Sequence, residues 1–122
     1  MKIRIEDNSV RLRLRRSEVA KLSEDGCLCA TTVFPEQLFE YCLQADPEID
    51  DLQASFKGGK ITVRLPGQWL QTWPDSSRVG FESSFKVGAS SLHILVEKDF
   101  VCLDRDPDTQ KDQFAHPRQG KI

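Results

Sequence analysis

The sequence predicts a mostly β, α+β protein made of two copies of one half-domain, each with the order ββαββ. Residues 10–14 (VRLRL) align with residues 61–65 (ITVRL), so that three apolar positions, one arginine and the alternation coincide. In step with this, Val19 aligns with Leu70, Leu22 with Trp73, Leu28 with Val79, and Phe39, Tyr41 and Leu43 with Leu92, Ile94 and Val96. Because a duplication of this kind usually closes one core from two equivalent halves, we expect a small antiparallel barrel with pseudo-two-fold symmetry.

Length and composition indicate one globular domain. The chain has 122 residues, of which 39% are hydrophobic and 30% charged, values typical of a folded protein rather than a disordered one. We expect a duplicated domain over residues 1–103, with halves at about 2–45 and 52–98, an acidic connector at 46–51 and a polar tail at 104–122.

The first half is expected to begin at once with a strand over residues 2–6, in which cationic and aliphatic side chains alternate. Ser17 is the expected N-cap of a short helix, which Gly26 ends. The other strands of this half are expected over residues 10–14, 28–34 and 38–43.

The second half repeats this order. Strands over residues 53–57 and 60–65 flank a Gly-Gly turn, and further strands are expected near 79–85 and 92–97. Between them, Pro66 is expected to start a helix that carries Trp69 and Trp73. Two aromatic residues four positions apart are typical of the apolar face of a helix, so we expect both to join the core.

Charge is unevenly distributed along the chain. Residues 1–16 contain six cations and two anions, whereas residues 46–51 contain four acidic residues and no cation. The formal net charge is −2, which argues against avid non-specific coating of DNA.

The cations of the first hairpin form the candidate binding surface. If the alternating aliphatic residues face the core, then Lys2, Arg4, Arg11 and Arg13 share the opposite face. Such a face is suited to phosphate oxygens, and Arg13 has the fork geometry for a guanine edge. Arg64 of the second half is included in the predicted surface. The alternative is an ordinary solvated strand face, or one balanced by the acidic residues 46–51.

No catalytic residue is predicted. The sequence has no Gly-rich phosphate loop, Gly-x-Ser-x-Gly or His-Glu-x-x-His, and neither His93 nor His116 has a companion nucleophile at a recognisable spacing. A barrel enzyme acting on a phosphate-containing ligand remains the competing hypothesis, and it needs Arg11 and Arg13 to point inward. That orientation exposes three aliphatic residues, each worth about 1.5–3 kcal/mol when buried, so it is disfavoured.

The cysteines predict neither disulfides nor a metal site. The first residues lack a secretory signal, and no apolar run approaches the length of a membrane span, so we expect a cytoplasmic protein with free thiols and no membrane partner. Cys27 and Cys29 are separated by one residue, whereas zinc sites usually have two to four residues between paired cysteines. No cofactor is predicted.

One stretch of the second half carries a family resemblance. Residues 59–66 read GKITVRLP and are followed by an expected short helix, a turn and Val-Gly-Phe-Glu. This resembles the half-barrel of the AbrB/MazE group of swapped-hairpin proteins, in which a Val-Arg-Ile-Pro-like strand end precedes a short helix. Arg13 and Arg64 both fall on the arginine of that motif. The resemblance covers about residues 2–98 and implies a single-chain barrel whose hairpin region contacts DNA.

The chain also departs from that group. Asp7 stands where the group has glycine, Arg15 where it has proline, and residues 75–78 lack the Gly-Asp of the second turn. These departures bear on DNA binding more than on the fold. Taken whole, the chain also resembles a family of small uncharacterised bacterial proteins, a resemblance that implies no activity.

The leading functional prediction is therefore a non-enzymatic binding or regulatory module whose partner is DNA or an acidic protein. The direction of Arg11 and Arg13 separates this class from the phosphate-ligand enzyme: outward favours binding and inward favours catalysis. A further possibility is that Asp112 and Phe114 of the tail dock on another chain and make the protein a subunit. The sequence leaves the oligomeric state open.

Overall fold

The computed structural model describes residues 1–100, 112 and 114 of the chain, and over these it is mostly β, as predicted. The elements in chain order are β1 (Lys2–Glu6), β2 (Ser9–Leu14), α1 (Arg16–Asp25), β3 (Cys27–Val33), β4 (Leu38–Asp46), β5 (Gln53–Lys57), β6 (Lys60–Pro66), two 3₁₀ helices (Gly67–Gln71 and Trp73–Asp75), β7 (Gly80–Val87) and β8 (Ser90–Lys98). Among these residues, no helix is both long and apolar enough to cross a membrane.

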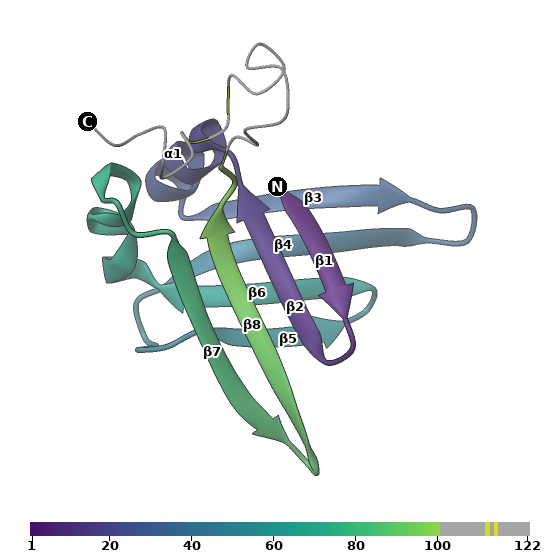
Figure 1. The fold of residues 1–122 in the computed structure, drawn as a ribbon. Coiled ribbons are helices and arrows are strands. Elements are labelled where there is room, and N and C mark those ends of the chain that lie inside the picture. The colour runs from purple at the N-terminus through teal and green to yellow at the C-terminus, as the bar shows by residue number, and fades with distance from the viewer. Residues whose placement is uncertain (101–111, 113, 115–122) are drawn as a thin grey trace.

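The strands form two four-stranded sheets. The first sheet has the order β1-β2-β8-β7 and the second has the order β3-β4-β6-β5. Figure 1 shows the first sheet crossing in front of the second, with α1 and the 3₁₀ helices at one end. Fully buried residues of both sheets, among them Leu12, Ile94, Leu43 and Val63, meet in one core. The prediction of a single closed barrel is therefore wrong, because the described strands make two separate sheets that pack face to face.

Each sheet takes one hairpin from each half of the chain. The hairpins themselves are antiparallel, as predicted, but β2 pairs with β8 and β4 pairs with β6 in parallel. An all-antiparallel arrangement is thus wrong at both central pairings. Short turns determine the direction of strands within a hairpin, but they do not act between hairpins of different halves.

The two parallel pairings are equivalent under the duplication. Val10 is the partner of Ile94 and Leu12 of Val96 in the first sheet. In the second sheet, Ile61 is the partner of Tyr41 and Val63 of Leu43. These are the same two pairs once residues 10–14 are aligned with residues 61–65, so the sequence repeat corresponds to a repeat in structure.

The helices differ from prediction at their ends. Arg15, not Ser17, is the N-cap of α1, because its extended backbone donates an N–H to Glu18 Oε1 at 2.8 Å. Gly26 ends the helix with a φ of 75°, a left-handed conformation that favours glycine. In the second half, two 3₁₀ helices separated by Thr72 replace the predicted single helix. Pro74 has no N–H to donate into a continuous helix, which accounts for the interruption.

The predicted core role of the tryptophans is confirmed. Trp73 is buried, and Trp69 stacks on Phe81 with ring centroids 4.4 Å apart. Phe81 pairs with Val96 as Leu28 pairs with Leu43, so Phe81 is the counterpart of Leu28. The predicted counterpart, Val79, is instead exposed, because the second copy is two residues longer before this strand than the alignment assumed.

The prediction that the cysteines are free thiols is also wrong. Cys29 and Cys42 are joined by a disulfide, and among the described residues only Cys27 is a free thiol. In the tail, Asp112 accepts a hydrogen bond from Ser17 N at 3.0 Å and Phe114 packs against the core of its own chain, while docking of these residues on another chain stays a prediction. Cys102, His116 and the rest of the predicted tail fall outside the described residues.

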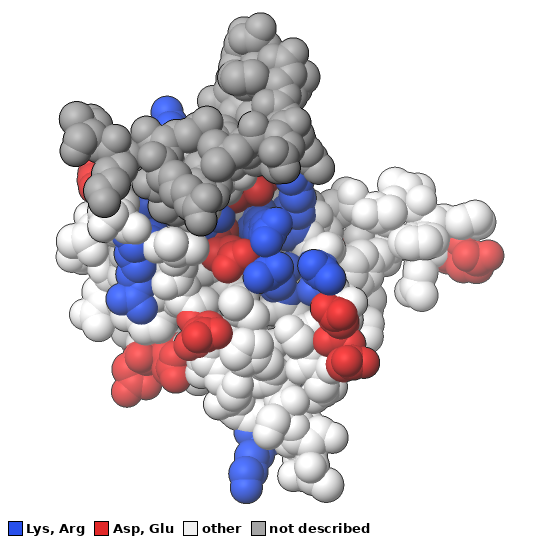
Figure 2. Space-filling view, viewed as in Figure 1, with Lys and Arg blue, Asp and Glu red and all other residues white. Residues whose placement is uncertain are grey.

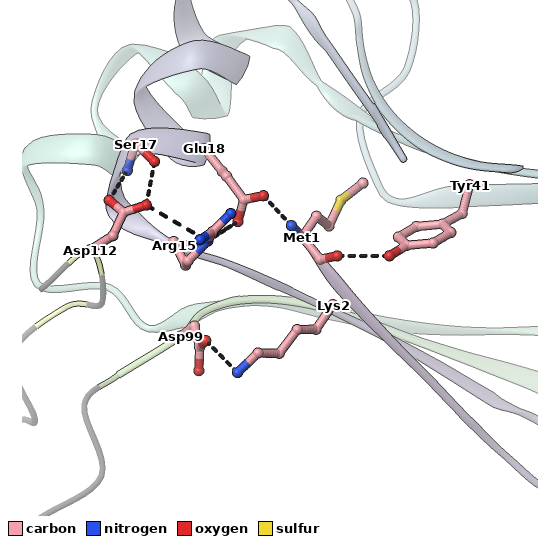
Figure 3. A network of polar contacts seen from close by, with 8 residues as sticks. All are labelled: Met1, Lys2, Arg15, Ser17, Glu18, Tyr41, Asp99 and Asp112. Atoms are coloured by element: carbon pink, nitrogen blue, oxygen red, sulfur yellow. Dashed lines mark hydrogen bonds and ion pairs between the residues drawn. The ribbon is translucent and has the colours of Figure 1, made fainter. Parts of the chain in front are cut away.

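A polar network connects the start of the chain to α1 (Figure 3). The Met1 side chain is almost fully buried and its amino group pairs with Glu18, while the Met1 carbonyl accepts a hydrogen bond from the Tyr41 hydroxyl at 2.7 Å. Burial raises the pKa of Glu18, but hydrogen bonds from the Met1 amino group and from Arg15 outweigh it, so the pKa is lowered overall. Folding therefore favours the ionised carboxylate.

We expect Glu18→Gln to lower the free energy of unfolding at pH 7 by about 1–3 kcal/mol, because it removes the charged partner of the partly buried Met1 amino group. Since folding lowers the pKa of Glu18 below its ordinary value of 4.5, the contribution of the Glu18 carboxylate to stability is present above that pH and is lost as the pH falls through the folded pKa. Urea unfolding over a range of about four pH units, from pH 3 to 7, measures the free energies of unfolding of both proteins. These free energies should converge in acid. A difference that is constant over this range would contradict the assignment.

Candidate anion-binding face

The four cations of the first hairpin lie on the outward side of the first sheet; we call them the basic face. In the β1–β2 ladder, Lys2 is opposite Arg13 and Arg4 is opposite Arg11. The intervening partners, such as Ile3 and Leu12, turn toward the core. Like charges directly across an antiparallel pair are destabilising, so this arrangement needs counter-charges.

Three carboxylates supply those counter-charges. Glu97, which is the parallel-strand partner of Arg13, has one oxygen, Oε1, that contacts Arg11 Nε at 3.1 Å and Arg13 Nε at 3.0 Å. Lys2 Nζ lies 2.9 Å from Asp99, and Arg4 lies 3.2 Å from Glu6. The positive charge of the basic face is thus balanced mainly by Glu97 of β8 and by Asp99, which directly follows this strand.

The predicted alternative of balance by residues 46–51 is not what the structure shows. Asp51 instead accepts a hydrogen bond from the Ser83 hydroxyl at 3.0 Å, at the edge of the same sheet but away from the arginines. The reason is topological: β8 pairs directly with β2, so Glu97 reaches the arginines first.

The basic face remains accessible and slightly positive. Four cations meet three carboxylates, which leaves one positive charge in excess. The four cations and Ile3 line a hollow of about 190 Å³. Arg4 and Arg13 side chains are 65% and 42% exposed, whereas Glu97 is only 16% exposed and lies lower in the face. Figure 2 shows basic side chains with acidic ones between them on this side of the molecule.

The structure does not bring Arg64 to this face. Arg64 lies on β6 of the second sheet, between Gln44 of β4 and Gln53 of β5. Because the sheets pack face to face, the outward sides of the two sheets point in opposite directions. The duplication makes Arg64 the equivalent of Arg13, and the pseudo-two-fold relation places the two on opposite sides.

Sequence reasoning missed a polar chain on the outward side of β7 and β8. Ser84 Oγ lies 2.7 Å from His93 Nδ1, and His93 Nε2 lies 3.3 Å from Glu82. The order hydroxyl, imidazole and carboxylate is that of a nucleophile, a base and an orienting acid. However, Glu82 is 66% exposed and His93 is 39% exposed, so water competes for each contact. Only the register of this hairpin, in which Ser84 is opposite His93, would have revealed the pair.

An apolar groove also opens between the two sheets. It has a volume of about 410 Å³, and its lining includes Val10, Phe39, Ile61, Phe85 and Leu92. Asp7, Asn8 and Ser9 supply polar groups where the β1–β2 turn borders it. The groove is large enough for an apolar group, but its lining does not select one chemistry.

Over the described residues, the fold and the basic face define a two-sheet, internally duplicated β protein with a cationic face on its first sheet. A family model described as a family of unknown function, DUF7009, matches residues 1–118, and the chain belongs to this family. The predicted resemblance to a family of small uncharacterised proteins is thereby confirmed as to the family, whereas this match gives no support to the AbrB/MazE resemblance. No curated protein matches the chain, and no solved structure does.

Proposed function

We propose that the protein is a non-enzymatic binding module that recognises a carboxylate-rich segment of a partner protein through the basic face. The observation that supports this is the convergence of four outward-facing cations on one hollow, despite the cost of placing like charges opposite each other. Glu97 shows that a carboxylate fits between Arg11 and Arg13. The outward direction of both arginines favours binding over the phosphate-ligand enzyme.

DNA is the less favoured partner. The carboxylates of Glu6, Glu97 and Asp99 leave the face an excess of only one positive charge, which suits a short acidic segment better than the dense, continuous phosphate charge of a duplex. Arg64, on the opposite side, cannot extend the contact along a duplex. The exchange of hairpins between sheets does support a proposed relationship to the AbrB/MazE group, but the charge of this face favours a shorter, acidic ligand.

The test compares a labelled oligoglutamate peptide with a random duplex DNA over a range of salt concentrations. We expect peptide binding that weakens with salt and falls about tenfold or more, or 1.4 kcal/mol, in Arg11→Ala/Arg13→Ala. Arg64→Ala is the matched control and should bind as the wild type does. Absence of peptide binding at low salt would overturn the proposal. Duplex binding with a steep salt dependence and the same mutant sensitivity would replace the protein partner with DNA.

We expect Glu97→Gln to increase affinity for the acidic peptide several-fold, because Arg11 and Arg13 lose the carboxylate that now occupies them. The same change should lower the free energy of unfolding by no more than about 1 kcal/mol, since partly exposed ion pairs contribute little. Fluorescence anisotropy and urea unfolding measure the two effects separately. An unchanged or lower affinity with the fold intact would contradict the proposed role of these arginines.

A further inference from the structure

Three cysteines and one glutamate gather on the outward side of the second sheet. Cys29 is directly opposite Cys42 in the β3–β4 ladder. Their neighbours Leu28 and Leu43 point into the core, so the two cysteines share the other side. Alternation along each strand brings Cys27 and Glu40 to that same side, one on either side of the Cys29–Cys42 pair.

The donor atoms lie close to the spacing of a tetrahedral metal site. Cys27 Sγ is 3.7 Å from Cys29 Sγ, and the donor atoms of Cys29, Glu40 and Cys42 are all within 4.8 Å of one another. Zinc–sulfur bonds of about 2.3 Å in a tetrahedron place neighbouring sulfurs about 3.8 Å apart. Cys29 belongs to both measured sets, whereas Cys27 is outside the closer set of three, so the disulfide has to open and the Cys27 side chain has to turn toward Cys42 and Glu40 before the four groups surround one ion.

The surroundings of the cluster provide one closed side and one open side. Cys42 is only 1% exposed, so its sulfur is shielded, whereas Cys27 and Cys29 are exposed and accessible to an incoming ion. Lys60 Nζ lies 4.0 Å from Glu40 and offsets part of the negative charge that thiolates would add. A soft, thiolate-rich donor set of this kind favours Zn²⁺ over Mg²⁺ or Ca²⁺.

We propose that the reduced protein binds one Zn²⁺ through the thiolates of Cys27, Cys29 and Cys42 and the carboxylate of Glu40. The Cys29–Cys42 disulfide occupies two of these sulfurs, so the site forms only after the disulfide is reduced. A dithiol supplies the two electrons and two protons: the protein disulfide becomes two thiols, and the dithiol becomes its own disulfide. Zinc then displaces the thiol protons, which pass to water or buffer.

The sequence predicted no metal site, because the one-residue spacing of Cys27 and Cys29 was compared with the wider spacing of zinc loops within a single chain segment. Here the ligands come from two strands, and the cross-strand register adds Cys42 and Glu40. In a reducing compartment, such as the predicted cytoplasm, the thiol form is the one expected to be present.

The experiment titrates the full chain with Co²⁺, and with Zn²⁺ against a chromophoric chelator, before and after reduction by a phosphine that is then removed. We expect one metal ion per reduced chain, with thiolate-to-cobalt charge-transfer bands and tetrahedral d–d bands, and none on the oxidised chain. Cys27→Ser and Glu40→Gln, both at accessible positions, should weaken binding by at least about tenfold without unfolding the protein. Circular dichroism verifies the fold of each variant.

Two control variants make the result decisive. Glu36→Gln changes an exposed glutamate in the turn of the same hairpin, and Cys102→Ser removes the remaining cysteine; both should bind metal as the wild type does. The proposal is overturned if the reduced chain binds no metal or if Cys27→Ser binds as tightly as the wild type. It is also overturned if Cys102→Ser abolishes binding, because the ligand set would then be a different one.

Discussion

Replacing Trp73 by alanine is expected to lower the free energy of unfolding by about 3–5 kcal/mol, a large share of the stability of a domain of this size. Trp73 is 1% exposed and makes an edge-to-face contact with Phe81, with ring centroids 5.2 Å apart. Its indole N–H donates to the Arg78 carbonyl at 3.1 Å. The substitution therefore creates a cavity between the 3₁₀ helices and β7 and leaves that carbonyl without its donor.

Urea unfolding followed by circular dichroism measures this effect without relying on the tryptophan itself. Phe56→Ala is a suitable control, because Phe56 is 67% exposed and its removal should cost less than about 1 kcal/mol. Equal losses for the two variants would show that the second half does not bury its aromatic residues as described.

The second large effect is expected for Gly80→Ala. A Cβ atom at this position would lie 2.2 Å from the Val96 carbonyl oxygen and 2.6 Å from Glu97 Cα, both in the backbone of β8. Backbone atoms cannot rotate away as a flexible side chain can, so the start of β7 must move. We expect a loss of about 3 kcal/mol in the free energy of unfolding, at the upper end for overpacking by one methyl group.

The matched control is Gly67→Ala, whose Cβ would meet only Ala45 Cβ at 3.9 Å, an ordinary contact. Urea unfolding should separate the two variants by more than about 1 kcal/mol. Similar stabilities for both would contradict the close approach of β7 and β8 at Gly80. Because Glu97 pairs with Gly80, the same variant should also disturb the basic face, and peptide binding provides a second readout.

Much of the fold follows from local sequence pattern. The alternation in residues 10–14 predicted the direction of every side chain in β2, and the duplication carried the same assignment to β6. Which strands pair between halves did not follow, because an apolar strand face fits a parallel or an antiparallel neighbour equally well. The prediction of a closed barrel was wrong for this reason. The order of strands within each sheet depends on contacts between hairpins far apart in sequence.

In the candidate site too, local pattern predicted the directions of side chains but not their partners from distant strands. The outward direction of Arg11 and Arg13 follows from Leu12 and Leu14 being buried, and alternation alone predicted it. The pairing of both arginines with Glu97 depends on the neighbour that β2 takes, 84 residues away along the chain for Arg13. Spacing rules likewise examine one segment at a time, so they could not group Cys42 and Glu40 with Cys27 and Cys29.

The parallel pairing of β2 with β8 also affects how the chain can be made. During synthesis from the N-terminus, the first hairpin emerges early, but its neighbour in the sheet is the last of the described strands. Until that strand leaves the ribosome, the edge of β2 that pairs with β8 stays open, and the core that buries its apolar side is incomplete. Folding of such non-local pairings is slow, and the exposed apolar surface is prone to aggregation in the meantime. The nascent chain therefore has to keep Val10, Leu12 and Leu14 from premature association until nearly the whole domain has been translated.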